Sequence, residues 1–229
     1  MQFINPANIL SSDVKAFFTT KAFNNGGIRI NDALSEEFNV LKENVYLPIQ
    51  KHTNKIHVLD HDDEPVVADA VITDRKHTLI GVLVADCVPI LLYDGKRRVI
   101  GAVHAGWRGT TEKILKEAIK TMQEKFECSP KDISVALGPS IRLCSYEVGE
   151  DVKIAVQQAT GVGDYFHQKG YKHFVDLSTA NKIQALSMEV PRENIWQSDE
   201  CTFCNPEKFY SYRYAKESNG RQGGFIGMW

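Results

Sequence analysis

The feature that most constrains the fold is a pair of almost uninterrupted apolar runs in the middle of the chain. The runs span Thr78 to Ala85 and Val88 to Tyr93. Each has the length of a strand, and because neither alternates apolar with polar residues, both faces of each strand are expected to be buried. A turn signal, Asp94-Gly95, follows the second run, and Arg98 to His104 is predicted to be a further strand. These strands therefore belong inside a sheet that is covered on both sides.

The remaining elements follow from periodicity and from signals at their ends. Strands are predicted at residues 13–19, 55–59, 66–73, 133–137, 209–214 and 224–228. Helices are predicted at residues 35–43, 110–126, 151–159 and 178–188. This mixture indicates an α/β class with a mixed sheet. The chain contains no repeat, low-complexity tract or linker-like stretch, so residues 1–229 are predicted to form a single domain.

Composition excludes several classes of protein. Of the 229 residues, 43% are hydrophobic and 24% are charged, which rules out a disordered chain or a coiled-coil rod. The formal net charge of −2 provides no global basic field, so nucleic acid is not an expected partner. No apolar run approaches the roughly 20 residues that span a bilayer, so no membrane association is expected. The first residues lack the features of a secretory signal, which together with sparse cysteines predicts a cytoplasmic protein with reduced thiols.

Two of the five cysteines form a single Cys-x-x-Cys, at Cys201 and Cys204. A structural zinc site would need a second such pair or a pair of histidines, and neither follows in the sequence. A redox motif would need a strand-to-helix context, which the flanking residues do not offer. The pair is therefore predicted to be structural.

Cys87 and His104 are expected to lie on one face of the predicted hairpin. A two-residue turn at Asp94-Gly95 would make His104 the diagonal neighbour of Cys87, and a four-residue loop from Asp94 to Arg97 would place the two directly opposite. Side chains alternate with period 2, so both registers bring the thiol and the imidazole together. Such a pair suits two ligands of one metal ion, and equally a cysteine nucleophile with its base.

An anion site is predicted beside His104. The segment 106–109 begins and ends with glycine, and one of the two threonines that follow it is expected to cap the next helix. The helix start would offer free N–H groups, and Arg108 would add a planar set of donors, as phosphate sites require. The alternative is that Arg108 pairs with a nearby carboxylate, such as Asp86 or Asp74.

A zinc site needs a third ligand, and the sequence offers four histidines upstream of Cys87. They are His52, His57, His61 and His77. Residue chemistry and spacing do not choose among them, and an isolated histidine is most often a solvated loop residue.

At this point the residues resemble a known family. The segments 85–89 (ADCVP) and 103–109 (VHAGWRG) are strongly similar to the YfiH-like family, whose members carry the names laccase-domain protein or multicopper polyphenol oxidase and also zinc-dependent purine nucleoside phosphorylase. Further matches are 138–148, which contains Gly-Pro-Ser-Ile and Tyr-Glu-Val, and the C-terminal 209–213 with Gly220-Arg221. The resemblance covers about residues 48–229. Departures occur at Arg142, where the family commonly has glycine, and at Ser145, where a second cysteine is common.

The resemblance implies a fold, a metal site and an activity. The implied fold is a layered sandwich of mixed β-sheets flanked by helices, similar to that of a cysteine hydrolase. The family's first ligand lies in a Gln-x-His-Gly context, which Gln50 to Thr53 matches except for threonine at the last position. The implied zinc ligands are therefore His52, Cys87 and His104. The implied activity is phosphorolysis of adenosine, inosine and methylthioadenosine, with adenosine deaminase activity, so the partners are a small purine nucleoside and phosphate.

The predicted zinc site assigns a role to each residue of the site. Two histidines and one cysteine leave a fourth coordination position open, which is typical of catalytic zinc. Cys87, His104, Asp86 and Arg108 are the predicted catalytic residues, with Asp86 or Glu147 carrying the proton that deamination requires.

Copper is the alternative metal, in a polyphenol oxidase, although seven histidines are few for a multicopper enzyme. A metal-free hydrolase with Cys87 as nucleophile and His104 as base is another alternative, and a non-catalytic zinc protein is the last.

Overall fold

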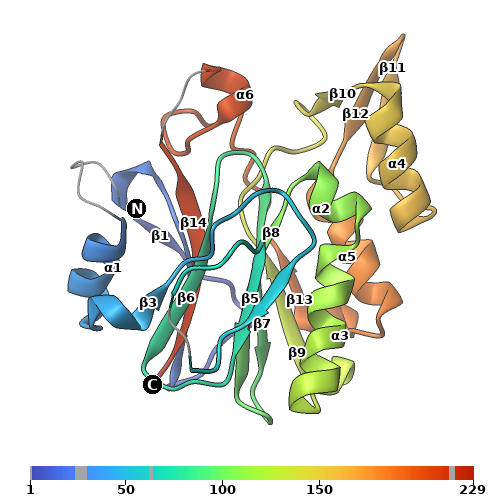
Figure 1. The fold of residues 1–229 in the computed structure, drawn as a ribbon. Helices are drawn as coiled ribbons and strands as arrows, with labels where there is room; N and C mark the ends of the chain where they lie inside the picture. Colours follow the sequence, from blue (N-terminus) through green and yellow to red (C-terminus); the bar gives the residue numbers. More distant parts are fainter. Residues whose placement is uncertain (1, 24–29, 62–63, 217–219) are drawn as a thin grey trace.

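The protein is built of four layers, with two β-sheets stacked face to face between two layers of helices (Figure 1). This structure is a computed structural model, and it describes all residues except 1, 24–29, 62–63 and 217–219. Both large sheets contain parallel as well as antiparallel pairs. The predicted α/β class with layered mixed sheets is confirmed.

One large sheet has five strands and the other has six. In spatial order the first contains β1 (Phe3–Ile4), β2 (Val14–Thr19), β14 (Gln222–Met228), β6 (Thr78–Val84) and β3 (Val45–Tyr46). The second contains β13 (Ile195–Gln197), β9 (Ile133–Leu137), β7 (Val88–Asp94), β8 (Val99–Ala105), β5 (Ala70–Thr73) and β4 (Ile56–Val58). A small third sheet contains β10 (Glu147–Val148), β12 (Lys172–Val175) and β11 (Phe166–Lys169).

The helices in the described part of the chain are α1 (Ile30–Phe38), α2 (Trp107–Thr111), α3 (Ile114–Phe126), α4 (Glu150–Thr160), α5 (Leu177–Ser187) and α6 (Tyr212–Ala215). Short 3₁₀ turns occur at Lys21–Phe23, Lys42–Asn44, Pro130–Asp132 and Arg192–Asn194. In Figure 1, α1 covers the five-stranded sheet, while α3 and α5 cover the six-stranded sheet.

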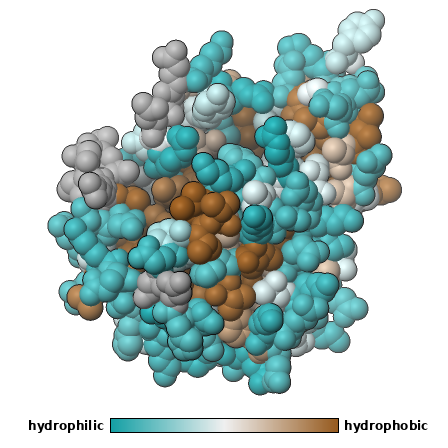
Figure 2. Space-filling view, viewed as in Figure 1, coloured by the Kyte–Doolittle hydropathy of each residue, from teal (hydrophilic) through white to brown (hydrophobic). Residues whose placement is uncertain are grey.

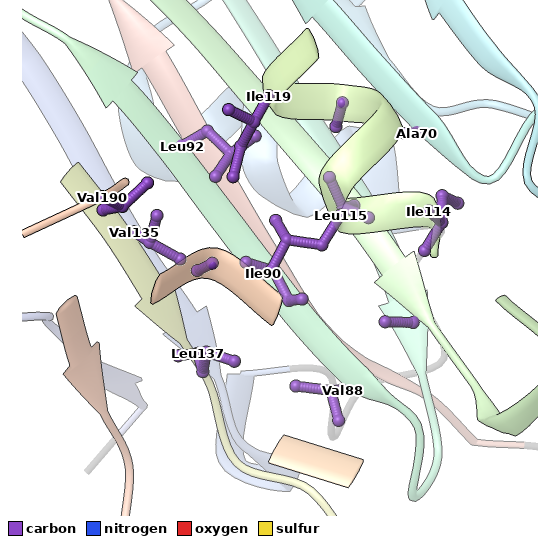
Figure 3. Close-up of a cluster of buried hydrophobic side chains, with 14 of the residues drawn as sticks. Ala70, Val88, Ile90, Leu92, Ile114, Leu115, Ile119, Val135, Leu137 and Val190 are labelled. Carbon is purple, nitrogen blue, oxygen red and sulfur yellow. The ribbon is translucent and has the colours of Figure 1, made fainter. Parts of the chain in front are cut away.

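The alternation of side chains along β7 explains why its sequence is apolar throughout. Ile90 and Leu92 point toward the helices, where they join a cluster with Leu115 and Ile119 of α3 (Figure 3). Leu91 points the other way and is buried between the two sheets. A strand with both faces covered has no position that favours a polar residue. The prediction that both faces of the central strands are buried is therefore confirmed.

The central hairpin differs in register from both predicted registers. Asp94 pairs with Val99, so the loop lies one residue later than expected, and Pro89 rather than Cys87 stands opposite His104. Cys87 lies just before β7, two residues from Pro89. The shift preserves parity, so the thiol and the imidazole still share a face, as predicted. Asp94 explains the shift, because its carboxylate accepts the backbone N–H groups of Lys96 and Arg97 and closes the loop after the strand.

The helix predicted at residues 110–126 is in fact two helices. Lys113 has a left-handed φ of 60° and separates α2 from α3. The prediction of a threonine cap was wrong, because Gly106 precedes α2 and no side chain caps that helix. Thr110 is instead buried and accepts a hydrogen bond from the Asn181 side chain of α5, at 2.9 Å. This contact ties α2 to the helical layer.

Two other predictions were wrong in type or position. The helix expected at residues 35–43 ends at Phe38, because Asn39 adopts a left-handed φ of 51°. The strand expected at residues 209–214 does not form. Its alternating aromatic residues imitate a strand, but the backbone N–H and C=O of Tyr210 bond to the side chain of Gln222, and α6 begins after Ser211. The Gln222 side chain thus takes the backbone hydrogen bonds that a neighbouring strand would have made with Tyr210.

The face of the molecule seen in Figure 2 is mostly hydrophilic, with separate hydrophobic areas near its centre. Some exposed apolar residues lie side by side, since Ile49 forms a β-bridge with Val67 and bonds to the Val66 carbonyl. In the described part of the chain, no helix is long and apolar enough to cross a membrane.

Candidate active site

A cavity of about 630 Å³ opens at one end of the two large sheets. Its lining comes from both sheets and from α2 and α6, which lie at the upper end of the sheets in Figure 1. The lining residues are Pro48, Gln50, His52, Leu83, Val84, Ala85, Asp86, Cys87, His104, Trp107, Arg108, Tyr146, Tyr212, Arg213 and Arg221. The cavity therefore contains all five residues that the sequence predicted for the site.

Three of these side chains converge in the cavity. The donor atoms of His52, Cys87 and His104 all lie within 4.8 Å of one another. The Cys87 Sγ is 3.9 Å from the His52 Nε2, and the two imidazole rings meet edge to face with centroids 4.7 Å apart. His52 comes from the loop before β4, Cys87 from the turn between β6 and β7, and His104 from β8.

The other three upstream histidines lie outside this cluster. His57, on β4, stacks on the ring of Tyr46 at 5.3 Å between centroids. His61 is exposed, and His77 lies in the turn before β6, where its N–H bonds to the Met228 carbonyl. Of the four upstream histidines, His52 is the one that lies beside Cys87 and His104, and it is also the one that the resemblance implied.

Asp69 holds the cluster together, and the sequence analysis missed it. This carboxylate is completely buried, and its Oδ1 lies 2.8 Å from the Nδ1 of His104. The same carboxylate accepts hydrogen bonds from the backbone N–H groups of Lys51, His52 and Thr53 and from the Thr53 hydroxyl. A single side chain thus orients one imidazole and the loop that carries the other. The signal available in the sequence was an aspartate inside an otherwise apolar strand, but its partners are distant in the chain.

The bonds to Asp69 also explain an unusual backbone conformation. His52 has a φ of 58°, in the left-handed region that non-glycine residues rarely occupy. Three successive N–H groups that point at one anion form a concave nest, and such a nest needs a left-handed residue. Charge-assisted hydrogen bonds to a buried carboxylate are strong enough to compensate for this conformation. The bonds to Asp69 therefore hold the backbone in the conformation from which the His52 side chain reaches the cavity.

The electrostatics of the three groups reinforce one another. Burial raises the pKa of Asp69, but hydrogen bonds from His104 and Thr53 outweigh burial and hold that pKa well below its usual range. Burial lowers the pKa of His104, but the charge of Cys87 and the hydrogen bond to Asp69 raise it to about 9. Burial raises the pKa of the Cys87 thiol, but the charge of His104 and hydrogen bonds from both histidines lower it to about 6. The site is thus preorganised to hold a thiolate beside a cation.

Gly106 matters for space rather than for backbone freedom. Its φ of −75° and ψ of −179° are open to any residue, contrary to the expectation from the sequence. A Cβ at this position would lie 3.0 Å from the Cys87 Sγ and 3.1 Å from the His52 Cδ2. Glycine therefore leaves the volume in which the two donor groups face each other.

The donor set fits a metal ion. Zinc binds cysteine sulfur at about 2.3 Å and histidine nitrogen at about 2.0–2.1 Å, so ligand atoms around one tetrahedral ion lie about 3.3–3.8 Å apart. The Cys87–His52 separation of 3.9 Å is close to that range. Because the His104 Nδ1 is bonded to Asp69, its Nε2 faces the cluster, and a carboxylate behind a histidine is the usual support of a metal ligand. His52, Cys87 and His104 could therefore hold one ion.

Asp86 borders the cavity next to Cys87, and its carboxylate also braces the wall. Its Oδ1 accepts the hydroxyl of Thr202 at 2.6 Å, and its Oδ2 accepts the backbone N–H of Arg213 at 2.7 Å. Asp86 has a left-handed φ of 88°. These bonds fasten the C-terminal segment to the turn that carries Cys87. Glu147, the other carboxylate considered, forms an ion pair with Lys172 in the small sheet.

Positive charge gathers in the cavity. Arg108 lies over the ring of Trp107 at 4.4 Å and forms no ion pair with a described carboxylate, so neither Asp86 nor Asp74 neutralises it. Arg213 and Arg221 line the same cavity, and the sequence analysis had not assigned them to the site. Arg213 lies over the ring of Tyr146, at 5.2 Å. An anionic reactant would be stabilised in this environment.

Comparison with known proteins adds an independent observation. The family model described as multi-copper polyphenol oxidoreductase laccase matches residues 28–229, which include every residue of the cluster and its surroundings. The chain belongs to this family. The family is associated with metal by its name, and the resemblance noted in the sequence is confirmed.

Individual relatives agree with this family assignment. A purine nucleoside phosphorylase of Clostridium acetobutylicum is 41% identical over 195 residues, which are 84% of this chain and 80% of the relative. The crystal structure of YlmD from Geobacillus stearothermophilus has a TM-score of 0.90 at 25% identity and covers 100% of this chain and 96% of its own. The YfiH protein of Bacillus licheniformis shares the fold, with a TM-score of 0.85 at 24% identity over 94% of this chain and 93% of its own.

Proposed function

We propose that this protein is a zinc-dependent purine nucleoside phosphorylase that also deaminates adenosine. Its substrates would be adenosine, inosine and methylthioadenosine, together with phosphate. The observation that carries the proposal is the convergence of His52, Cys87 and His104 in a cavity that is also lined by arginines. The 41% identical relative named purine nucleoside phosphorylase supports the same activity.

Zinc is the metal that this donor set favours. His52, Cys87 and His104 would hold it and leave a fourth position for a reactant. Bound zinc supplies a Lewis acid and lowers the pKa of water to about 7. A blue-copper site with two histidines and one cysteine also uses a weak axial methionine, and no methionine lines the cavity in the described part of the chain. Nor do the described residues contain a further histidine cluster of the kind a multicopper enzyme needs.

Arg108 is the proposed phosphate ligand. Its guanidinium is fixed by contact with Trp107 and is not neutralised by a carboxylate, so its donors remain available to an anion. Arg213 and Arg221 line the same cavity and would add positive charge. Arginine forks match phosphate oxygens in pairs, which orients the nucleophile toward the sugar.

Trp107 and Tyr146 are the proposed contacts for the purine. Both line the cavity, and aromatic faces bind flat bases by stacking. A volume of about 630 Å³ lies within the usual range for small-molecule sites, about 300–1,000 Å³. Pro48 and Leu83 add apolar surface to the same lining, as a base requires.

Asp86 is the proposed proton carrier for deamination. It borders the cavity beside Cys87, and each of its oxygens keeps a lone pair beyond the bonds to Thr202 and Arg213. A carboxyl group next to the reacting carbon can deliver a proton to the leaving amine. Its two hydrogen bonds would hold it at a fixed distance from the substrate.

Metal analysis combined with a product assay tests the proposal. Protein purified without added metal is expected to contain zinc in the cavity site, and a His52→Ala, Cys87→Ala variant is expected to lose it. With adenosine and phosphate, the wild type should release adenine and ribose 1-phosphate, and without phosphate it should form inosine. Copper together with oxygen-dependent oxidation of a phenol would favour the oxidase instead. An active enzyme without metal, whose Cys87 reacts covalently with a carbonyl probe, would favour the Cys–His hydrolase.

Replacement of Arg108 separates the two activities. Arg108→Gln removes charge-assisted hydrogen bonds worth about 1.5–3 kcal/mol, so kcat/KM for phosphate should fall by about 10–100-fold. Phosphate-independent deamination should change much less. Arg97→Gln is the matched control, since Arg97 is half-exposed and pairs with Glu127 on the surface. Equal losses of both activities in the Arg108 variant would refute the assigned role.

A further inference from the structure

A second group of sulfur atoms lies outside the cavity site. The donor atoms of Cys144, Cys201 and Cys204 all lie within 4.8 Å of one another. The Sγ atoms of Cys144 and Cys204 are 3.5 Å apart, and all five cysteines of the chain are free thiols. The sequence offered only the Cys201–Cys204 pair. Folding brings the third sulfur from a loop that lies about 60 positions earlier in the chain.

The backbone around this cluster is well fixed. Ser140 and Cys201 form a parallel β-bridge, and the Thr202 N–H bonds to the Ser140 carbonyl. Cys201 is buried, and its carbonyl accepts hydrogen bonds from the backbone N–H and the side-chain NH₂ of Asn205. The cluster therefore has one buried cysteine on a fixed backbone and two exposed ones, with an open side toward solvent.

We propose that Cys144, Cys201 and Cys204 form a second metal site, which binds one thiophilic divalent ion of the zinc class. Sulfur ligands at about 2.3 Å around a tetrahedral ion lie about 3.8 Å apart, so the observed cluster needs only small side-chain movements to close around an ion. Soft thiolate ligands select zinc over harder ions such as magnesium. The site shares no residue with the cavity cluster.

Ser145 stands beside the fourth coordination position. Its Oγ lies 3.2 Å from the Cys204 Sγ and 3.4 Å from the Cys144 Sγ. Three sulfurs with this hydroxyl, or with a water in its place, would complete a tetrahedron. A cysteine at this position would instead provide four sulfurs.

The ion would fasten two segments that build the rim of the cavity. Cys144 lies two residues before Tyr146, and Cys204 lies in the segment that leads to Arg213. These two rim residues already contact each other, and Arg213 also donates to the Glu147 carbonyl. A metal at the base of both segments would restrain their separation, much as a structural zinc stabilises a small domain.

A disulfide is the competing explanation for close cysteines. It would use two of the three sulfurs and would leave the third without a role. It would also need Cys144 and Cys204 to approach from 3.5 Å to the roughly 2.05 Å of an S–S bond. The test therefore treats a disulfide as a refuting outcome.

Zinc stoichiometry tests the proposal on the full-length protein. After loading with Zn²⁺ in the presence of a phosphine reductant and dialysis, the wild type should retain two ions per chain. Cys204→Ser should retain one, and so should His52→Ala, Cys87→Ala, which empties only the cavity site. Cys128→Ala is the matched control, because Cys128 is buried next to Asp94 and Arg97 and belongs to neither cluster, and it should retain two. Zinc content is thus measured separately for the cavity site and for the cysteine cluster. If one site binds no zinc, the result for the other site can still be interpreted.

Four further measurements keep the test decisive if a variant merely unfolds. In the His52→Ala, Cys87→Ala variant, Co²⁺ should produce a thiolate-to-cobalt charge-transfer band about three times as intense as the band from a one-thiolate site. Ser145→Cys should tighten zinc binding in competition with a chelator. Zinc at about 100-fold above its Kd should raise Tm by about 5–10 °C and protect Cys144 and Cys204 from alkylation. The proposal is overturned if the Cys204→Ser variant keeps the wild-type metal content, or if peptide mapping finds a Cys144–Cys204 disulfide and no second ion under reducing conditions.

Discussion

Replacement of Asp69 by asparagine tests the argument that one buried carboxylate organises the cavity site. In the wild type, Oδ1 accepts from His52 N–H and His104 Nδ1, while Oδ2 accepts from Lys51 N–H and from both donors of Thr53. An amide has one acceptor oxygen, so its NH₂ must face donors on one side. The less costly orientation keeps the oxygen in the Oδ2 position and turns the NH₂ toward the two histidines.

The expected magnitude follows from those contacts. In that orientation the His52 N–H loses its partner, which costs about 1–3 kcal/mol, and the remaining bonds lose their ionic character. We therefore expect Asp69→Asn to lower the free energy of unfolding of the metal-free protein by about 2–4 kcal/mol. The NH₂ would also favour the His104 tautomer that is protonated on Nε2, the nitrogen that faces the cluster. Loss of this kind of support typically lowers metal affinity by about 10–100-fold.

Urea unfolding measures the stability, and competition against a chelator measures the zinc affinity. Thr53→Val is the matched control, since it removes one hydrogen bond to the same carboxylate and leaves the imidazole untouched. It should cost stability with little change in affinity. Asp60→Asn, at an exposed carboxylate that accepts the backbone N–H of the adjacent His61, should change neither quantity by much. Wild-type zinc affinity in a folded Asp69→Asn variant would refute the reasoning.

Three further predictions concern the thiol, the core and the wall of the cavity. In metal-free protein, the rate of Cys87 alkylation, measured by peptide mass spectrometry, should rise with pH around a midpoint of about 6 and then level off. The reason is that the reactive thiolate forms above the thiol pKa, which His104 lowers. A midpoint near pH 9 would contradict this. Leu91→Ala should lower the free energy of unfolding by about 2–5 kcal/mol in urea titrations, since the side chain is fully buried between the sheets. Thr202→Val should cost about 1.5–3 kcal/mol by the same measurement, since it removes a hydroxyl from the buried Asp86 carboxylate, and an unchanged midpoint would show that this bond contributes nothing.

Errors in the sequence analysis occurred where a distant partner replaced a local one. The pattern at 209–214 alternates as a strand does, yet the Gln222 side chain takes the hydrogen bonds that a neighbouring strand would provide. The helix predicted from Thr110 is interrupted at Lys113, where the chain turns so that Thr110 can bond to α5. In both places the local pattern was sound, and packing elsewhere in the protein overrode it.

The sequence by itself determined the double-sided burial of the central strands and the common face of Cys87 and His104. Both depend on local chemistry: apolar residues leave water, and side chains on a strand alternate with period 2 whichever loop closes the hairpin. Only the tertiary structure decided the rest of the site. Asp69 acquires its role from three N–H groups and an imidazole that lie at least 16 positions away, and the sulfur cluster needs Cys144 beside Cys204. Such contacts depend on how whole layers pack, which no periodicity in one chain encodes.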